Sequence, residues 1–366
     1  MKPYLRDGVD VYIEDLPDNG LCTIFFVFLS TRKRIQVSAK SDFLKILPLL
    51  DGENTISDVS CITNIPLKDI EKFVHYLESQ NIVTTKDWYQ EIDLLDNYKK
   101  LVEKQLYFLM DMLHSPVEVC EVQKRIQSTN VGIFGLGSTG SWVLVELLQM
   151  GFENFRLYDF KELKKDSVSR HAIFSEKHVG ELKADFYGNL AKRINPGADL
   201  VTKKFSISTD SKITDELSDL DIIINCADEP YVGYTSIALS RYCVAHGKVL
   251  YVAGGFDAHL GCLGEMIVPQ KTPCSDCYNH FFKESLKDWK PVAHPVKNRE
   301  KGFGGLAPLS VFSASTAALS ILRYFLNEDQ FLDSAGGRGE FKFDDYSIDS
   351  FEVRRDSNCG VCGDIR

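Results

Sequence analysis

The sequence predicts an α/β protein, on the evidence of three stretches. Residues 130–140 read N-V-G-I-F-G-L-G-S-T-G, where a short apolar strand leads into a glycine-rich turn and then a helix with apolar spacing. Phe155 to Tyr158 has the composition of a second strand. Asp221 to Ala227 is almost uniformly apolar, which is typical of a parallel strand covered on both faces.

The turn between the first strand and helix has the pattern G-x-G-x-x-G, formed by Gly135, Gly137 and Gly140. Glycines allow a tight turn and a close approach of the backbone to a phosphate, which would sit at the positive end of the new helix. Asp159 follows the second strand at about the 20-residue distance expected of an acid that binds a ribose hydroxyl. The combination favours a nucleotide site over a purely structural turn.

Composition narrows the class of protein. The chain has 366 residues, which suggests two domains, and 44% hydrophobic with 26% charged residues is ordinary for a globular protein. The net charge of −10 argues against general affinity for nucleic acid or anionic membranes. We expect no membrane-spanning run and no signal peptide, and therefore a cytoplasmic protein whose ten cysteines do not form a disulfide framework.

Residues 1–90 predict a small winged-helix-like domain of strands and helices. Its amphipathic helix, starting near Pro66 and running to Gln80, places apolar residues on one face. DNA binding is the common role of such units, but Leu67 to Lys72 carries as many acids as bases. The domain resembles the recognition domains of enzymes that modify ribosomal peptides, which add a leader peptide to a sheet edge. The remaining predicted elements are strands at 9–13, 22–29, 34–38 and 82–84 and helices at 41–50 and 55–63.

The segment 86–127 is rich in Leu, Lys, Asp and Glu and is predicted to be helical. We interpret residues 91–127 as a linker or dimerisation arm and residues 128–366 as the catalytic domain.

Two cations behind Asp159 suggest a triphosphate. Arg170 has the planar group that suits phosphate oxygens, and Lys183 can act as a point charge on the same group. Taken alone, solvated helix positions would be the simpler explanation of both residues. Asp228 follows the apolar strand 221–227, and strand carboxyl ends in an open α/β sheet meet at the ligand edge. There its carboxylate could hold Mg²⁺, or it could simply cap a loop or helix.

Two C-x-x-C pairs predict a structural zinc site. The first is Cys274 with Cys277 and the second is Cys359 with Cys362. Together they supply the four soft ligands of a closed tetrahedral site, which stabilises a domain and cannot activate water. Redox-active or independent thiols are the alternative.

Taken in order, these motifs resemble the ThiF/MoeB/MccB-type, ubiquitin-activating-enzyme-like adenylating family. They are G-L-G-S-T-G, Asp159, S-V-S-R-H, V-G-E-L-K-A, C-A-D-E-P and the paired knuckles, and the match covers about residues 127–366. The resemblance implies a Rossmann-like, mostly parallel sheet with helices on both faces. It implies activation of a carboxylate by Mg-ATP in a homodimer, with Asp159 on ribose, Arg170 and Lys183 on phosphates and Asp228 on magnesium.

The chain departs from the family pattern at two points. Ser167 stands where the family usually has an asparagine, so this phosphate contact reaches less far. The family also commonly supplies an arginine from the partner subunit, and the sequence does not choose among its basic candidates. These are Lys99, Lys100, Lys104, Lys124 and Arg125.

No cysteine lies between Tyr278 and Asn358, so an enzyme thioester is not expected. A leader-binding module fused to such a domain resembles the peptide-tailoring enzymes of microcin C and pantocin A biosynthesis. The resemblance implies adenylation of a ribosomally made precursor peptide, ending either in side-chain cyclisation or in a phosphorus–nitrogen bond at the peptide terminus. Ser167 inclines the interpretation toward cyclisation. Adenylation of a ubiquitin-like or sulfur-carrier protein is a further alternative.

Competing interpretations are an NAD-dependent dehydrogenase, which leaves the knuckles and cations unexplained, and a winged-helix regulator that senses a nucleotide. His171 could accept a proton, although packing or capping is its commoner use. Residues 290–305, with Lys297, Arg299 and Lys301, could form a lid or a solvated loop. By the same resemblance, residues 254–256 and 306–308 fall where the family has substrate-side loops.

Overall fold

We describe a computed structural model of the chain. It describes residues 1–15, 20–205, 207, 217–253, 259–290, 304–326 and 337–363. The chain divides into two compact units, one made of Met1–Leu95 and Lys104–Glu121, the other of Asp96–Glu103 and Val122–Arg366. The division at 1–90, 91–127 and 128–366 stays a prediction.

The first unit contains an antiparallel three-stranded sheet in the order β2-β3-β4 (Val9–Asp15, Leu21–Phe28 and Arg34–Lys40). A second, two-stranded sheet pairs β1 (Pro3–Leu5) with β5 (Val83–Thr85). The sequence did not predict β1, because three residues have no recognisable periodicity and only pairing with a distant strand defines them.

The helices of the first unit follow the predicted pattern with one exception. α1 (Ile56–Thr63) begins at a capping box between Thr55 and Asp58. α2 (Leu67–Ser79) buries its predicted face against the sheet core, which includes Ile70, Phe73, Val74 and Leu77.

The predicted helix at 41–50 is wrong. Two short 3₁₀ helices, η1 (Ser41–Lys45) and η2 (Leu47–Leu49), occupy this stretch. Pro48 lacks an N–H group and its ring would meet the carbonyl of Leu44, so an α-helix cannot continue through it.

The segment predicted to be helical, 86–127, is helical. It contains α3 (Trp88–Glu91), α4 (Asp96–Leu101), α5 (Glu103–Leu113) and α6 (Pro116–Ser128). Their apolar faces supply buried residues such as Leu106, Leu109 and Ile126.

The second unit is built on a six-stranded sheet in the order β12-β10-β9-β6-β7-β8. The strands are β6 (Asn130–Phe134), β7 (Asn154–Tyr158), β8 (Asp199–Lys203), β9 (Ile222–Asn225), β10 (Val249–Val252) and β12 (Glu265–Ile267). Only β12 runs antiparallel to its neighbour; the other pairs are parallel. The strand order reverses between β6 and β9, which is the place where such sheets bind ligands.

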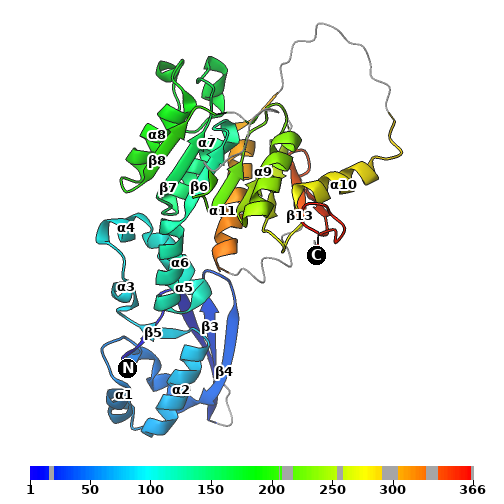
Figure 1. The fold of residues 1–366 in the computed structure, drawn as a ribbon. Helices are drawn as coiled ribbons and strands as arrows, with labels where there is room; N and C mark the ends of the chain where they lie inside the picture. The colour runs from blue at the N-terminus through cyan, green and yellow to red at the C-terminus, as the bar shows by residue number, and fades with distance from the viewer. Residues whose placement is uncertain are drawn as a thin grey trace. The chain divides into compact units, whose positions relative to one another are not determined.

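Helices cover both faces of this sheet, as predicted (Figure 1). α7 (Ser138–Gln149) packs against α8 (Lys183–Ile194) and α11 (Ala307–Leu326). α9 (Val232–His246) packs against α10 (Ser275–Ser285). A smaller antiparallel sheet, β11-β13-β14 (Leu260–Leu263, Gly337–Lys342 and Ile348–Glu352), completes the described part of the unit.

Candidate functional site

The glycine turn connects β6 to α7 at the point where the strand order reverses. Gly135 has φ +84°, and a Cβ there would lie 2.7 Å from the carbonyl oxygen of Cys226. A Cβ at Gly140 would lie 1.9 Å from the carbonyl oxygen of Gly135. Both glycines are therefore required by the packing of the turn against its neighbours.

Gly137 differs from the other two glycines, because a Cβ added there would have no described atom within 4 Å. Gly137 is the N-cap of α7, with extended backbone and no side-chain cap. The first turn of a helix has N–H groups without intrahelical partners. Open space at an uncapped helix start suits an anionic ligand better than it suits a packed turn.

Asp159 ties the turn to the end of β7. Its buried carboxylate accepts hydrogen bonds from the Leu136 N–H at 2.7 Å and from the Lys161 N–H at 2.8 Å. Each oxygen can accept a second bond, so contact with a ribose hydroxyl remains chemically available. That role stays a prediction.

Lys183 is brought to the same edge by a short antiparallel pairing. Glu162 forms a β-bridge with Leu182, and the Lys183 N–H donates to the Lys161 carbonyl at 3.0 Å. The side chain is 9% exposed and stands at the first position of α8, where a positive charge opposes the helix dipole. Burial and the charges of Lys161 and Arg170 lower the pKa of Lys183, while Asp159 and Asp228 oppose this shift.

Arg170 lies half-buried at the end of a 3₁₀ turn, η3 (Lys165–Ser169). The Trp142 indole N–H donates to its backbone carbonyl at 3.2 Å, which fixes the main chain beside α7. Within the described residues, neither the Arg170 guanidinium nor the Lys183 ammonium has a hydrogen-bond or ion-pair partner. Two cations that lie close enough to repel each other, without a protein anion bound to either, are suited to phosphate.

Ser167 is buried in the same turn, and its hydroxyl makes a long hydrogen bond of 3.4 Å to the Asp166 carboxylate. The structure thus gives Ser167 a local partner, and its phosphate role stays a prediction.

Asp228 is exposed in the loop after β9. The Cys226 N–H donates to the Phe134 carbonyl at 2.7 Å, so this loop begins directly beside the glycine turn. The charges of Asp159, Arg170 and Asp228 all influence the pKa of Lys183. The four residues therefore lie in one region. Magnesium binding by Asp228 stays a prediction.

Sequence reasoning missed Asn225, which orders the loop before Asp228. Its fully buried amide donates to the hydroxyls of Thr235 and Ser236 at 2.9 and 3.1 Å, and its oxygen accepts from the Ala227 N–H at 3.1 Å. The sequence contains one indication of this role, because Asn225 is the single amide side chain at the end of an otherwise apolar strand.

The predicted cysteine pairs come together as a single buried centre. The sulfur atoms of Cys274, Cys277, Cys359 and Cys362 all lie within 4.8 Å of one another. The Cys274–Cys359 and Cys277–Cys362 sulfur distances are 3.7 and 3.4 Å, far longer than a disulfide bond of about 2.05 Å. Four thiolates around zinc at about 2.3 Å would stand about 3.8 Å apart, so the centre fits zinc.

Polar contacts hold the two knuckles in place. A hydrogen bond from Cys274 lowers the pKa of Cys277, the same contact together with burial raises the pKa of Cys274, and burial raises the pKa of Cys362 to about 11. Asp276 receives two hydrogen bonds from the Arg241 guanidinium, at 2.7 and 3.1 Å, which anchors α10 to α9. The Arg355 guanidinium donates to the Cys362 carbonyl at 2.8 Å in the second knuckle.

A family model described as the ThiF family matches residues 112–361. The chain belongs to the ThiF family. Among the relatives of this ThiF protein, Protein HesA, vegetative, of Trichormus variabilis is 27% identical over 248 residues, covering 66% of this chain and 84% of that protein. The adenylyltransferase and sulfurtransferase UBA4 of Lodderomyces elongisporus is 20% identical over 332 residues, covering 89% of this chain and 67% of that protein.

Solved structures share the fold of this ThiF protein. E. coli MccB with MccA-N7isoASN superposes with a TM-score of 0.70 and 19% identity, covering 100% of both chains. A structure of PaaA gives a TM-score of 0.61 and 16% identity, covering 78% of this chain and 92% of that one. At these identities the likeness establishes architecture alone.

His171 is buried in the ThiF domain next to the two cations, and its Nδ1 has no hydrogen-bond partner among the residues that the structure describes. Burial, followed by the charges of Lys183 and Arg170, lowers its pKa to about 3. A histidine with so low a pKa stays neutral near pH 7 and is a weak base.

The basic candidates for a partner-subunit role have local contacts. Lys99 is buried, Lys104 lies 5.5 Å from the centre of the Tyr107 ring, and Arg125 lies 5.3 Å from that of Phe325. None of them is singled out by these contacts.

The expectation that no run is long enough to cross a membrane is wrong for α11. Among the described helices, α11 alone is long and apolar enough to cross a membrane. Half of its most apolar 18-residue stretch is buried inside the protein. It packs on α7 and β11, as a core helix does.

The predicted substrate-side loops are only partly described. Ala307 and Pro308 form the first turn of α11 rather than a loop. Residues 254–256, and Lys297, Arg299 and Lys301 of the 290–305 segment, lie outside the described residues.

Proposed function

We propose that this ThiF-family chain adenylates a carboxylate on a ribosomally made precursor peptide, using Mg-ATP. The proposal is carried by one pair of cations, Arg170 and Lys183, which have no hydrogen-bond or ion-pair partner in the described part of the chain. They lie in the region of an uncapped helix start with open space at Gly137. A nicotinamide dehydrogenase would leave these two cations unexplained.

In the proposed reaction a peptide carboxylate oxygen attacks the α-phosphorus of ATP. The bond from that phosphorus to the bridging oxygen of pyrophosphate breaks, and pyrophosphate leaves with the negative charge. Arg170 and Lys183 stabilise this charge as it develops, and Asp159 orients the ribose. Asp228 would hold magnesium, which would supply further positive charge beside the phosphates. The product is a mixed anhydride, in which the former carboxylate has a good leaving group.

The anhydride is proposed to react directly with a nucleophile from the substrate. Burial raises the pKa of Cys226 to about 12, and also that of Cys243 to about 12, so neither provides a thiolate at neutral pH. Cys262 is buried under α11. These environments support a reaction without an enzyme thioester.

Two outcomes for the peptide are considered. Ser167 in place of the family's asparagine favours side-chain cyclisation with loss of water. The whole-chain likeness to MccB, solved in complexes with MccA, favours modification at a peptide terminus with a phosphorus–nitrogen bond. Mass spectrometry of candidate precursor peptides after incubation with Mg-ATP distinguishes them: loss of water indicates cyclisation, and gain of a nucleotidyl mass indicates the terminal modification. Unchanged masses for every peptide would contradict both.

The peptide is proposed to bind through the N-terminal unit, by adding a strand to the β2-β3-β4 sheet. Within the described strands, β2 and β4 each have one edge without a neighbour, and β2 exposes Tyr12 and Ile13. Hydrogen–deuterium exchange with a bound precursor peptide should protect amides of β2 or β4 and leave central β3 unchanged. Protection confined to residues 128–366 would contradict this mode of binding.

The four-cysteine centre is proposed to hold one structural Zn²⁺, and the protein is proposed to act as a homodimer in the cytoplasm without binding nucleic acid. With all four ligands supplied by the chain, the metal contributes to folding and takes no part in the chemistry.

A further inference from the structure

Lys161 lies between two residues that are proposed to bind the nucleotide. Its N–H donates to the Asp159 carboxylate at 2.8 Å, and its carbonyl accepts from the Lys183 N–H at 3.0 Å. The charge of the Lys161 ammonium group also lowers the pKa of Lys183. The side chain of Lys161 is therefore a third cation in the region of the glycine turn.

Lys161 differs from Arg170 and Lys183 because a protein carboxylate is bound to it. Its Nζ lies 2.5 Å from Oε1 of Glu229, the residue after Asp228. Lys161 follows β7 and Glu229 follows β9, and β6 lies between these two strands in the sheet. Neighbouring strands stand about 4.8 Å apart, so the ion pair joins the two loops across the carboxyl end of β6. The glycine turn begins at this point, and a phosphate is proposed to bind there.

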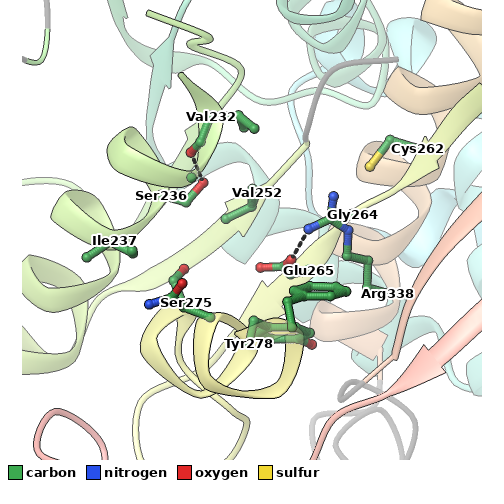
Figure 2. Close-up of a pocket in the computed structure, with 13 residues that line it drawn as sticks. Val232, Ser236, Ile237, Val252, Cys262, Gly264, Glu265, Ser275, Tyr278 and Arg338 are labelled. Carbon is green, nitrogen blue, oxygen red and sulfur yellow. Dashed lines mark hydrogen bonds and ion pairs between the residues drawn. The ribbon is translucent and has the colours of Figure 1, made fainter. Parts of the chain in front are cut away.

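The loop that carries Glu229 is fixed where it leaves β9 and where it enters α9. The Ser236 hydroxyl, in the first turns of α9, accepts from the Asn225 amide at 3.1 Å and donates to the Val232 carbonyl at 2.6 Å. Figure 2 shows the second of these contacts, at a pocket that Val232 and Ser236 line. Anchors at both ends keep the backbone of Glu229 near Lys161, while its exposed side chain has room to rotate.

The ion pair is suited to exchange with a ligand. The side chain of Lys161 is 32% exposed and that of Glu229 is 55% exposed. Solvent-exposed ion pairs contribute little to stability, so separating this one costs little. A phosphate group carries more negative charge than a carboxylate and forms strong hydrogen bonds with cationic side chains. The Glu229 carboxylate would also repel a triphosphate lying over the glycine turn, which favours its rotation away from Lys161.

We infer that Lys161 is a third phosphate-binding residue, and that Glu229 takes the place of the phosphate until the nucleotide binds. For the identity of the ligand, a nucleoside triphosphate, the inference rests on the proposed function. It assigns opposite effects to the two members of one ion pair, because Lys161 adds to nucleotide affinity and Glu229 reduces it. An ion pair that only tied the two loops together would act in the same direction through both residues.

Titration calorimetry of Mg-ATP with the intact protein, without peptide, tests the two signs. Lys161→Met should weaken binding by about 10-fold, the usual effect of losing a charge-assisted hydrogen bond. Glu229→Gln keeps the size of the side chain and removes its charge. It should strengthen binding by about 2- to 5-fold, the range over which exposed ion pairs shift an equilibrium. Weaker binding by Glu229→Gln, unchanged binding by Lys161→Met, or no binding by the wild type would overturn the inference.

Glu176→Gln is the matched control, because it removes the same charge from a surface pair with Lys165, 3.6 Å apart. It should leave ATP binding unchanged, and a gain equal to that of Glu229→Gln would overturn the inference in favour of overall charge. In a Lys161→Met background the gain from Glu229→Gln should be smaller, since the carboxylate then has no cation for which to compete. An undiminished gain there would overturn the exchange.

Failure of the proposed adenylation would give a different result. Pyrophosphate exchange would be absent in the presence of the precursor peptide, while Lys161→Met and Glu229→Gln would keep their opposite effects on ATP binding. Effects of the same sign with exchange intact would overturn the role of Lys161 alone. The two failures are therefore distinguishable.

Discussion

The glycine-turn site and the four-cysteine centre lie in the same unit but differ in whether their polar groups have partners within the protein. The cysteine centre is closed: four sulfur atoms face one another, and all four residues are buried. The glycine-turn site is open: among the described residues neither Arg170 nor Lys183 has a hydrogen-bonded or ion-paired anion, and Gly137 leaves space. The first arrangement suits a structural metal, whereas the second suits an anionic ligand.

Loss of the metal centre should have the largest effect on folding. Structural zinc contributes about 10–16 kcal/mol in zinc-finger peptides. Cys359→Ser removes one of four ligands, so we expect loss of bound zinc and a marked fall in the unfolding temperature. Metal analysis and calorimetry measure both.

The matched control for this change is Cys61→Ser, since Cys61 is exposed on α1 and distant in sequence from the centre. It should keep one zinc per chain. A wild-type protein that retains no zinc after mild purification would contradict the assignment of the centre.

Stability should depend on pH through His171. Its pKa is about 3 in the folded protein, against about 6.5 when unfolded, so between these values the unfolded chain binds the extra proton. The free energy of unfolding should therefore fall as the pH drops below 6.5, by up to about 1.4 kcal/mol per unit. Chemical denaturation of wild type and His171→Gln from pH 7 to pH 4 measures this.

The difference in stability between wild type and His171→Gln should move in favour of the variant as the pH falls. A difference that stays constant across this range would show that His171 does not carry the dependence.

Lys183→Met sharpens the contrast between the two regions, because it should raise stability while abolishing activity. The substitution removes a charge that is buried, opposes the α8 dipole and is repelled by Lys161 and Arg170. The attraction of Asp159 and Asp228 is lost with it, and the expected net gain is about 1 kcal/mol. Denaturant unfolding measures it. Destabilisation of the apo protein by this change would mean that Lys183 has a structural role.

Cys226→Ala should have the smallest effect of all. Its thiol is protonated at neutral pH, and a reaction without a thioester does not need it. We expect peptide-dependent turnover within about twofold of wild type, by analogy with substitutions that touch no reacting group. A complete loss of turnover in a folded variant would favour a covalent enzyme intermediate.

Local patterns predicted the parts of this fold that depend on local rules. The glycine turn requires positive φ at Gly135, and paired C-x-x-C motifs require only that two knuckles meet, so both could be found from spacing. The predicted helix at 41–50 is wrong because Pro48 interrupts the apolar spacing that suggests it. The buried ion pair of Glu265 with Arg338 could not be found in this way, since the two residues belong to strands of different sheets, distant in sequence, that only the tertiary fold brings together.

The central claim is that Arg170 acts on a phosphate group during adenylation, and pyrophosphate exchange tests it most directly. Labelled pyrophosphate should enter ATP in the presence of Mg²⁺ and the precursor peptide. Arg170→Ala should reduce this exchange by about 10²- to 10³-fold, the usual effect of losing a group that stabilises developing charge. Lys165→Ala is the control: Lys165 lies in the 3₁₀ turn that precedes Arg170, but its side chain pairs on the surface with Glu176. This change should leave the exchange unchanged. Near-normal exchange in Arg170→Ala would contradict the account.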